Sequence, residues 1–424
     1  MLRILIECGH ERNRNAGDEA YFASMVHLFR NYFEDVNISA FSDRPSRDRS
    51  RYGIKTIYSG GTLYGTLFSS LDILKGIRAC DVYVWGGGQL LRDDTGIKSP
   101  LYRLSRPFIA KLLGKPLMAY AVGVGPLEMG KTRFFARKIL NLFDLITVRD
   151  SKSLELLKHI GVSKPDILLT VDPAFGLEIS PDEIVEKALK QLPLDRNTPI
   201  VGVAPFGPAF RWVRSLLPAK YQVKFDMWSP GGKSKYQNHV RNMALICDHV
   251  VKQYDVALIF IAQDISWQGC DDEISRAIIS HMSRSEKAVL INADDYRPET
   301  LKGIIGRMAF MIGGRMHSLI LACSVGTPVL GICFEDKIRQ LGGILGQKEC
   351  FIDAKEIGNF AEMHFLISKM LNERQYISSE LINLIGKLSI EVQKNVHRLD
   401  RLVSNYERQD PKRKAVYSAS RSTC

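Results

Sequence analysis

The chain lacks any apolar run long enough to form a membrane-spanning helix. Of its 424 residues 45% are hydrophobic, but no stretch approaches the about 18 consecutive apolar residues that a span requires. The first stretch, Met1 to Ile6, is too short for the apolar region of a secretory signal and has no small-residue cleavage site. We therefore expect a cytoplasmic protein whose first β-strand begins at Leu2.

The chain also lacks the sequence signatures of several metal and cofactor sites. Its eight cysteines are scattered, without a Cys-x-x-Cys pair, which indicates neither a zinc site nor a disulfide framework. The patterns G-x-G-x-x-G and G-x-x-x-x-G-K-[ST] are absent, so a dinucleotide fingerprint or a P-loop is not supported. We expect reduced, mostly buried thiols, no metal and no cofactor.

Arginine-rich helices and mixed basic and aromatic stripes, which are typical of nucleic-acid-binding proteins, are absent as well. The formal charge is nevertheless +12 at pH 7. Part of it lies in Arg44 to Lys55, where we expect an Arg-rich loop, and in the tail from Arg408 to Arg421. We expect no nucleic-acid partner. Anionic substrates account for the charge, and the basic tail suits peripheral association with the inner face of a membrane.

Strand and helix patterns alternate twice along the chain, and glycines and charged residues follow many of the strands. Two such series predict an α/β protein with two Rossmann-like domains and a ligand site in the cleft between them. The expected parts are a first domain at 1–178, a linker helix at 179–198, a second domain at 199–350, helices at 351–408, and a basic, disordered tail at 409–424. A long loop at 205–235 is expected to be flexible or to face the acceptor.

The stretch from Arg307 to Lys337 is the strongest single candidate for a site. A buried strand is predicted to end at Gly313-Gly314, and Arg315 and His317 follow directly before a helical pattern. Open α/β sheets bind ligands at the carboxyl ends of their strands, so an arginine for an anion and an imidazole for a proton outline a site. The alternative is a salt-bridged arginine and a hydrogen-bonded histidine, and the glycines and the strand-end placement favour the site.

Other strand ends carry residues of the same kinds. Asp18, at a strand-to-helix turn, is either the N-cap of the helix or a group that binds or deprotonates a sugar hydroxyl. The triplet Gly86, Gly87 and Gly88 either lets backbone N–H groups face a ligand or allows tight packing. Arg149 either binds an anion or forms a surface pair with the adjacent Asp150. The further candidates at strand ends and helix starts are Gly17, Gly123, Asp172, Gln263 and Ser318.

These pieces, in this order, resemble the polysaccharide pyruvyl transferase family. The resemblance covers residues from about 2 to about 345, and the ordered set carries it rather than any single piece. One departure is Phe334, where members of the family often have Tyr. The matching segments are Asn15-Ala16-Gly17-Asp18-Glu19-Ala20, Trp85-Gly86-Gly87-Gly88, Gly123-Val124-Gly125-Pro126, Val148-Arg149-Asp150, Asp172-Pro173-Ala174, Gln263-Asp264, and Gly313-Gly314-Arg315-Met316-His317-Ser318 through Pro328 to Lys337.

The resemblance implies a glycosyltransferase-B-like fold with a helical C-terminal extension, and transfer of a pyruvyl group from phosphoenolpyruvate to a sugar as a cyclic ketal. Carried over by position, Arg315 and His317 match the family's Arg-x-His, and Lys337 its later basic residue. We expect Arg315, Arg149 and Lys337 to bind the anionic donor, His317 to act as general acid, and Asp18 to orient or deprotonate the acceptor. The implied partners are phosphoenolpyruvate and a saccharide, which family context suggests is lipid-linked.

Two alternatives remain at this point. The nearest is a nucleotide-sugar glycosyltransferase of the same architecture, and many retaining enzymes of that kind carry an E-x₇-E pattern in the second domain. Glu178 and Glu186 have this spacing, but they lie before the expected second domain. The other alternative is a non-catalytic scaffold with a degenerate site, against which the charged residues at the strand ends argue.

Overall fold

The structure is a computed structural model that describes residues 1–9, 15–59, 70–93, 98–195, 197–207, 225–265 and 270–409. Most of the expected 205–235 loop and the expected disordered tail after 409 lie outside the described residues. The chain forms two compact units. Unit 1 comprises Met1–Asn13, Tyr21–Pro173 and Leu388–Cys424, and unit 2 comprises Arg14–Ala20 and Ala174–Lys387.

Unit 1 contains a seven-stranded sheet in the order β3-β2-β1-β4-β5-β6-β7. All neighbouring strands are parallel, and the strand order reverses between β1 and β4, where Ile4 pairs with Val82. An order that reverses in this way defines a topological switch point, where ligands bind in Rossmann-like folds. The strands are β1 (Leu2–Glu7), β2 (Val36–Ser42), β3 (Lys55–Tyr58), β4 (Val82–Gly86), β5 (Leu117–Val122), β6 (Leu145–Val148) and β7 (Asp166–Leu169).

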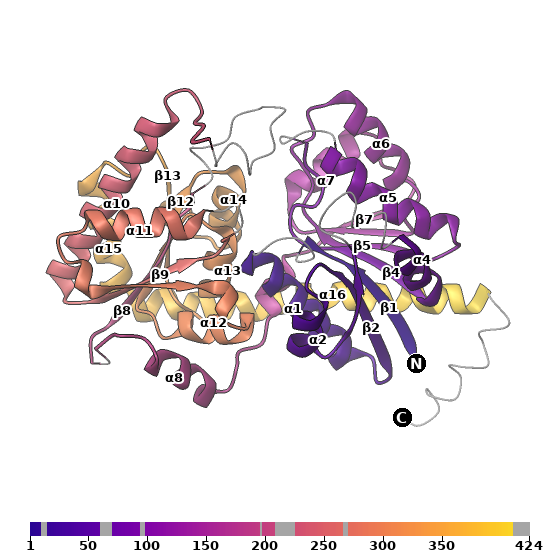
Figure 1. Cartoon of the computed structure of the whole chain (residues 1–424), viewed down its shortest axis with the longest axis horizontal. Coiled ribbons are helices and arrows are strands. Elements are labelled where there is room, and N and C mark those ends of the chain that lie inside the picture. Colours follow the sequence, from indigo (N-terminus) through magenta and orange to yellow (C-terminus); the bar gives the residue numbers. More distant parts are fainter. Residues whose placement is uncertain are drawn as a thin grey trace. The chain divides into compact units, whose positions relative to one another are not determined.

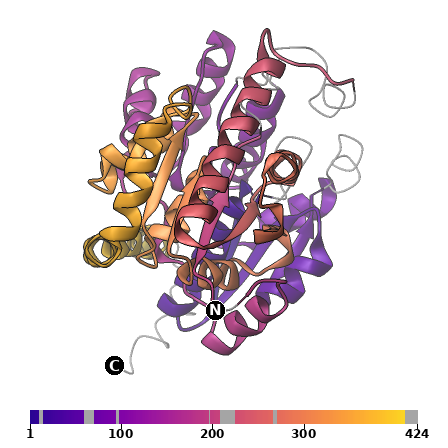
Figure 2. The ribbon, with the colours of Figure 1, turned by 90° about the vertical axis from the view of Figure 1, so that its left-hand side faces the viewer.

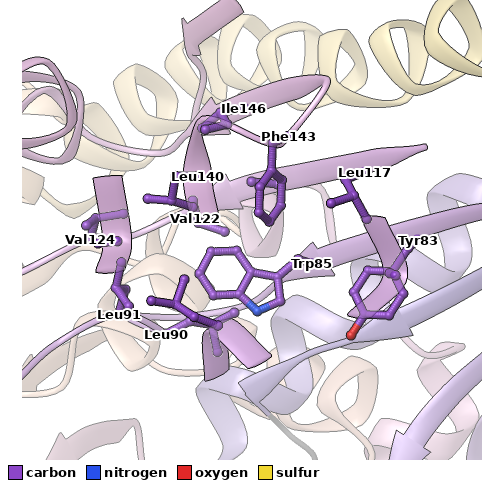
Figure 3. Packing of buried hydrophobic residues seen from close by; sticks show 14 of the residues in the cluster. Tyr83, Trp85, Leu90, Leu91, Leu117, Val122, Val124, Leu140, Phe143 and Ile146 are labelled. Atoms are coloured by element: carbon purple, nitrogen blue, oxygen red, sulfur yellow. The ribbon is translucent and has the colours of Figure 1, made fainter. Parts of the chain in front are cut away.

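One face of this sheet is covered by α4, α5, α6 and α7, whose apolar residues share a single core (Figure 1). Trp85 lies at the centre of that core, fully buried, with its ring 5.7 Å from the ring of Phe143 (Figure 3). The helices that contribute to unit 1 are α1 (Ala16–Tyr32), α2 (Pro45–Tyr52), α4 (Ser70–Ala79), α5 (Lys98–Leu112), α6 (Gly130–Leu140), α7 (Ser151–His159) and the second half of α16 (Arg374–Gln409).

Unit 2 contains a six-stranded parallel sheet in the order β10-β9-β8-β11-β12-β13, which reverses between β8 and β11. The long helix α10 runs along one face of this sheet (Figure 2) and packs against α11 and α15. The strands are β8 (Ile200–Ala204), β9 (Ala257–Ala262), β10 (Ala288–Asn292), β11 (Phe310–Gly313), β12 (Val329–Cys333) and β13 (Phe351–Asp353). The helices are α8 (Asp182–Lys190), α10 (Gly232–Tyr254), α11 (Asp271–His281), α12 (Pro298–Gly306), α13 (Met316–Cys323), α14 (Asp336–Ile344) and α15 (Phe360–Asn372).

The expected fold class, two Rossmann-like units with a helical C-terminal extension, is confirmed. The expected loop from Arg44 to Lys55 is wrong, because α2 occupies most of it and β3 begins at its end. Pro45 starts α2, and Gly53 ends it in the left-handed conformation, with its N–H donating to Arg49 O. The segment has almost no apolar stripe, so periodicity could not reveal this helix. The strand β13 likewise begins the stretch expected to be helical, and its three residues are too few to show a period.

The described residues contain no disulfide, no candidate metal site and no candidate membrane span. The seven described cysteines are free thiols, six of them buried. No group of His, Cys, Asp and Glu there is arranged to hold a metal ion. Among the described helices, none has both the length and the apolar character needed to cross a bilayer.

Trp85 provides a test of the unit 1 core. Trp85→Ala removes a fully buried indole and should lower the free energy of unfolding of unit 1 by about 3–5 kcal/mol. Leu71→Ala, at a side chain 67% exposed on α4 of the same unit, should change it by less than about 0.5 kcal/mol. Urea unfolding measures both, and equal effects would contradict the placement of the core.

Candidate active site

A glycine packed between two aromatic side chains lies at the switch point of unit 2. Gly314, directly after β11, donates its N–H to Ala204 O at the end of β8, at 2.9 Å. A Cβ on Gly314 would lie 2.9 Å from Cβ of Phe206 and 2.9 Å from the ring of Phe334, so no larger residue fits there without displacement. The two rings are 5.3 Å apart. These contacts fix the backbone at Gly314, and Arg315 is the next residue.

Arg315 is held by a buried carboxylate. Its Nη2 and Nε donate to the two oxygens of Asp271 at 2.7 and 2.8 Å, and its guanidinium lies 4.5 Å from the ring centre of Phe206. Asp271, fully buried at the start of α11, also accepts the backbone N–H of Asp264 at 3.0 Å and of Gly207 at 3.3 Å. One carboxylate thus joins the ends of β8, β9 and β11.

At Asp271, burial has a larger effect on the pKa of the carboxyl than the neighbouring guanidinium has. Burial raises the pKa of the Asp271 carboxyl, and the neighbouring guanidinium acts in the opposite direction. Burial acts to lower the pKa of Arg315, but the Asp271 and Asp264 carboxylates raise it overall, so the arginine stays charged. Asp264 is 4.0 Å from Nη2 of Arg315. The cation expected to meet an anionic ligand is therefore already compensated by two carboxylates.

His317, the second residue of α13, packs against the start of α1. A Cβ on Gly17 would lie 2.2 Å from Nδ1 of His317, so the imidazole rests directly on this glycine. Gly17 N–H donates to Oδ1 of Asn15 at 2.8 Å, and Ala16 N–H donates to Gln263 O at the end of β9 at 2.9 Å. These contacts attach residues 15–20 to unit 2.

The interpretation of Asp18 as an N-cap is wrong, because Asn15 provides that cap. Asp18 instead lies in the first turn of α1, where a carboxylate interacts favourably with the helix dipole. It is buried, one residue after the glycine that contacts His317.

Two further candidates in unit 2 have buried polar atoms that lack hydrogen-bond partners among the described residues. These atoms are Nε2 of Gln263, after β9, and Oγ of Ser318, in the first turn of α13. Burying a polar group without a hydrogen bond costs about 1–3 kcal/mol, so such atoms are uncommon in folded proteins. Lys337, in contrast, is paired with Glu335, its Nζ 2.6 Å from the carboxylate.

The remaining candidates belong to unit 1. Arg149, buried after β6, donates to Asp172 at 2.5 Å, and the alternative of a surface pair with Asp150 is wrong because Asp150 caps α7. Burial acts to lower the pKa of Arg149, and Asp172 raises it overall. A Cβ on Gly123 would be 3.1 Å from this guanidinium, so the two groups are in contact. Every cation proposed for the donor thus has a carboxylate partner.

The glycine triplet is accounted for by packing. A Cβ on Gly87 would lie 2.4 Å from Sγ of Cys8, and its φ of 104° is unfavourable for other residues. Gly88 has φ of 40° and accepts from Gly123 N–H at 2.9 Å. A Cβ on Gly86 would be 3.3 Å from Met25 and from Tyr120 O. These glycines bring β1, β4 and β5 together at their carboxyl ends.

The sequence alone does not reveal the residue that holds Arg315. Asp271 stands at the head of an acidic first turn, Asp271-Asp272-Glu273, and such a turn predicts a helix start rather than an ion pair. The pairing spans 44 positions in sequence, which no local pattern reveals. Phe206 was missed for the same reason.

Comparison with known proteins identifies the family. The sequence model of the polysaccharide pyruvyl transferase family matches residues 15–332. The chain belongs to the polysaccharide pyruvyl transferase family. The matched span begins at the cap of α1 and ends in β12, so it includes Asn15, Gly17, Arg149, Asp271, Arg315 and His317, while Lys337 lies beyond it.

Among curated proteins, the chain is 20% identical over 274 residues to the amylovoran biosynthesis protein AmsJ of Erwinia amylovora. The alignment covers 63% of this chain and 60% of AmsJ, so the chain spans less than two thirds of that relative.

Several solved structures have a similar fold at low sequence identity. UDP-GlcNAc 2-epimerase of Methanocaldococcus jannaschii matches with a TM-score of 0.58 and 11% identity, covering 88% of this chain and 92% of the epimerase. HepE of Anabaena, solved with UDP-glucose, matches with a TM-score of 0.57 and 13% identity, covering 95% of this chain and 100% of HepE. A glycosyltransferase of Rickettsia africae matches with a TM-score of 0.57 and 12% identity, covering 95% of this chain and 99% of the glycosyltransferase. These similarities confirm the glycosyltransferase-B-like fold.

The contact between Gly17 and His317 can be tested directly. Gly17→Ala must displace the imidazole and should destabilise unit 2 by about 1–3 kcal/mol, with a shifted His317 ring signal in NMR spectra. Gly386→Ala is the matched control, because a Cβ there meets open space on α16, and it should stabilise the helix by up to about 1 kcal/mol. If both variants behaved alike, the close contact would be refuted.

The buried ring of His239 should make unit 2 less stable in acid. It lies on α10 with its ring 5.1 Å from that of Phe334, and burial lowers its pKa to about 4. The unfolded chain, with an ordinary histidine pKa of about 6.5, binds a proton at higher pH than the folded one, so stability falls as pH drops from about 6.5 to about 4, by about 3 kcal/mol. His239→Gln should remove this part of the pH dependence in urea titrations, and His281→Gln, at an exposed ring of α11, should retain it.

Proposed function

We propose that this protein transfers the pyruvyl group of phosphoenolpyruvate onto two hydroxyls of a saccharide, forms a cyclic ketal and releases phosphate. The observation that carries the proposal is the turn between β11 and α13 in unit 2. There Arg315 and His317 follow β11 directly, at a topological switch point. This turn lies within the span that matches the family, and the name of the family supports the transfer of a pyruvyl group to a polysaccharide. The saccharide is proposed to belong to a surface polysaccharide or its precursor.

Anion binding at the turn between β11 and α13 is proposed to depend on the direction of N–H groups more than on net charge. Asp271 uses two of the five N–H donors of Arg315 and fixes the plane of the guanidinium. The first turn of α13 adds backbone N–H groups that have no partner within the helix, and such turns bind carboxylate and phosphate. Gln263 Nε2 and Ser318 Oγ are the side-chain atoms we propose for hydrogen bonds to substrate.

The proposed chemistry begins with a proton transfer to the donor. His317 protonates the CH₂ carbon of phosphoenolpyruvate, which makes C2 electrophilic. One sugar hydroxyl attacks C2, the C2–O bond to phosphate breaks, and the second hydroxyl closes the ring. The two hydroxyls release two protons, of which one restores His317 and the other is carried by the departing phosphate. No oxidant or reductant is required.

Asp18 is proposed to orient or deprotonate an acceptor hydroxyl. It lies in the first turn of α1, next to the glycine on which His317 rests. Arg149 stays the unit 1 candidate for a substrate anion and Lys337 the further candidate in unit 2, each with the carboxylate partner described above.

The role of His317 is tested by separating binding from turnover. His317→Asn should lower phosphate release from phosphoenolpyruvate in the presence of acceptor by about 10²–10⁴-fold, the usual contribution of a general acid. Binding of phosphoenolpyruvate, measured by calorimetry, should change only a few-fold. His281→Asn, at an exposed histidine of the same unit, should leave both unchanged. Full turnover in His317→Asn would remove this residue from the mechanism.

The acceptor and the rival activity can be addressed in one assay. Labelled phosphoenolpyruvate and, separately, a labelled nucleoside-diphosphate sugar are incubated with the protein and with the lipid-linked oligosaccharides of the source cells. Transfer of label from phosphoenolpyruvate as acid-labile pyruvate supports the proposal and identifies the sugar. Transfer of label from the nucleotide sugar alone would favour a glycosyltransferase. If the protein bound neither donor, a non-catalytic scaffold would be favoured.

A further inference from the structure

The outer face of α6 carries two exposed phenylalanines between basic residues. Phe134 and Phe135 are 55% and 40% exposed, with their rings 5.5 Å apart. Lys131 and Lys138 lie one turn before and after them on the same stripe, and the ammonium of Lys138 is 5.7 Å from the ring centre of Phe134. The opposite face of α6 packs into the core through Thr132, Ala136 and Leu140. Large aromatic side chains on a solvent-facing helix stripe usually mark an interaction site.

The neighbouring helix α5 extends this surface. It packs against α6 (Figure 1), and two of its apolar side chains, Phe108 and Leu112, are 41% and 71% exposed. Met129, just before α6, is also exposed. We call the exposed side chains of α5 and α6, together with Met129, the α5–α6 surface.

The charge of the α5–α6 surface has one sign. The sequences of α5 and α6 contain four Lys or Arg each and no Asp or Glu. Among the side chains of these helices that the structure describes, the exposed cations are those of α6, namely Lys131, Arg133, Arg137 and Lys138. Lys111 of α5 is paired with Asp144, and Glu128 is an exposed acid at the amino end of α6. The net charge of this surface is therefore positive.

We propose that the α5–α6 surface binds the anionic surface of a lipid bilayer. Aromatic and aliphatic side chains with Lys and Arg beside them are what an interfacial helix presents to headgroups and upper acyl chains. Anionic lipid attracts such cations, and the apolar rings are removed from water. A second copy of the same face would bring like charges together, so self-association through this surface is disfavoured. The proposal does not depend on the proposed transferase activity.

Binding there would place a particular edge of unit 1 near the bilayer. In a parallel sheet, the helix after a strand begins at the carboxyl edge of the sheet, and α6 begins seven residues after Gly123. The loop between them therefore runs from the strand-end glycines to the α5–α6 surface. A saccharide on a lipid carrier would meet unit 1 on this edge.

The test is flotation of the full-length protein with vesicles. Binding is measured to phosphatidylcholine alone and to phosphatidylcholine with phosphatidylglycerol, at low and high salt. We expect binding only to the anionic vesicles, weakened by salt because screening shortens the range of the attraction. Lys131→Gln with Lys138→Gln should weaken it about 25-fold, about fivefold for each cation. Phe134→Ser with Phe135→Ser should weaken it by at least about tenfold.

Matched double variants in unit 2 are the controls. Lys187→Gln with Lys190→Gln removes two exposed cations of α8, and Phe365→Ser with Tyr376→Ser removes two aromatic rings that are 68% and 66% exposed. Both controls should bind anionic vesicles like the original protein. Absence of vesicle binding would overturn the proposal, and so would equal binding by the α6 variants, which would show that another part of the chain binds the vesicles. The proposal would also be overturned if the protein did not bind vesicles but bound itself or an oligonucleotide, and if Phe134→Ser with Phe135→Ser weakened that binding.

Discussion

The ion pair between Arg315 and Asp271 is the interaction on which the carboxyl edge of the unit 2 sheet depends. The fully buried carboxylate accepts two N–H groups of the guanidinium and two backbone N–H groups, so it joins the ends of three strands. Breaking a buried pair by removing one partner costs about 3–5 kcal/mol, because the other charge remains buried. The orientation of Arg315, and with it the start of α13, is therefore set by a residue far away in sequence.

Unit 1 contains a related arrangement with different connections. Arg149 follows β6, contacts Gly123 and is paired with Asp172 beyond β7. In both units an arginine at the carboxyl end of a strand is held by a buried aspartate. Such an arginine presents N–H donors in a fixed geometry, and it contributes little net charge to its surroundings. Recognition of an anion by either arginine would thus depend on geometry first, which suits a donor whose carboxylate and phosphate have fixed relative positions.

The sequence predicts the parallel strands and the residues at their ends, because buried strands, glycine turns and helix starts are local patterns. Arg315, His317 and Arg149 were found in this way. What could not be found are contacts between distant segments, such as Asp271 with Arg315 or Gly17 with His317. The helix α2 was missed because its polar sequence lacks an apolar stripe, although Pro45 and Gly53 mark its two ends. The glycine triplet likewise makes contacts between distant segments, because a side chain on Gly86 or Gly87 would meet Met25 or Cys8.

The most direct test of this account is calorimetric titration of phosphoenolpyruvate onto Asp271→Asn and, as a matched control, onto Asp272→Asn, the neighbouring residue in the same turn. Circular dichroism on both variants verifies that they are folded. We predict that Asp271→Asn loses at least about tenfold in affinity, because its amide cannot hold the guanidinium as the carboxylate does. Asp272→Asn should bind as the original protein does. A folded Asp271→Asn variant with unchanged affinity would contradict the central role of the Arg315–Asp271 pair.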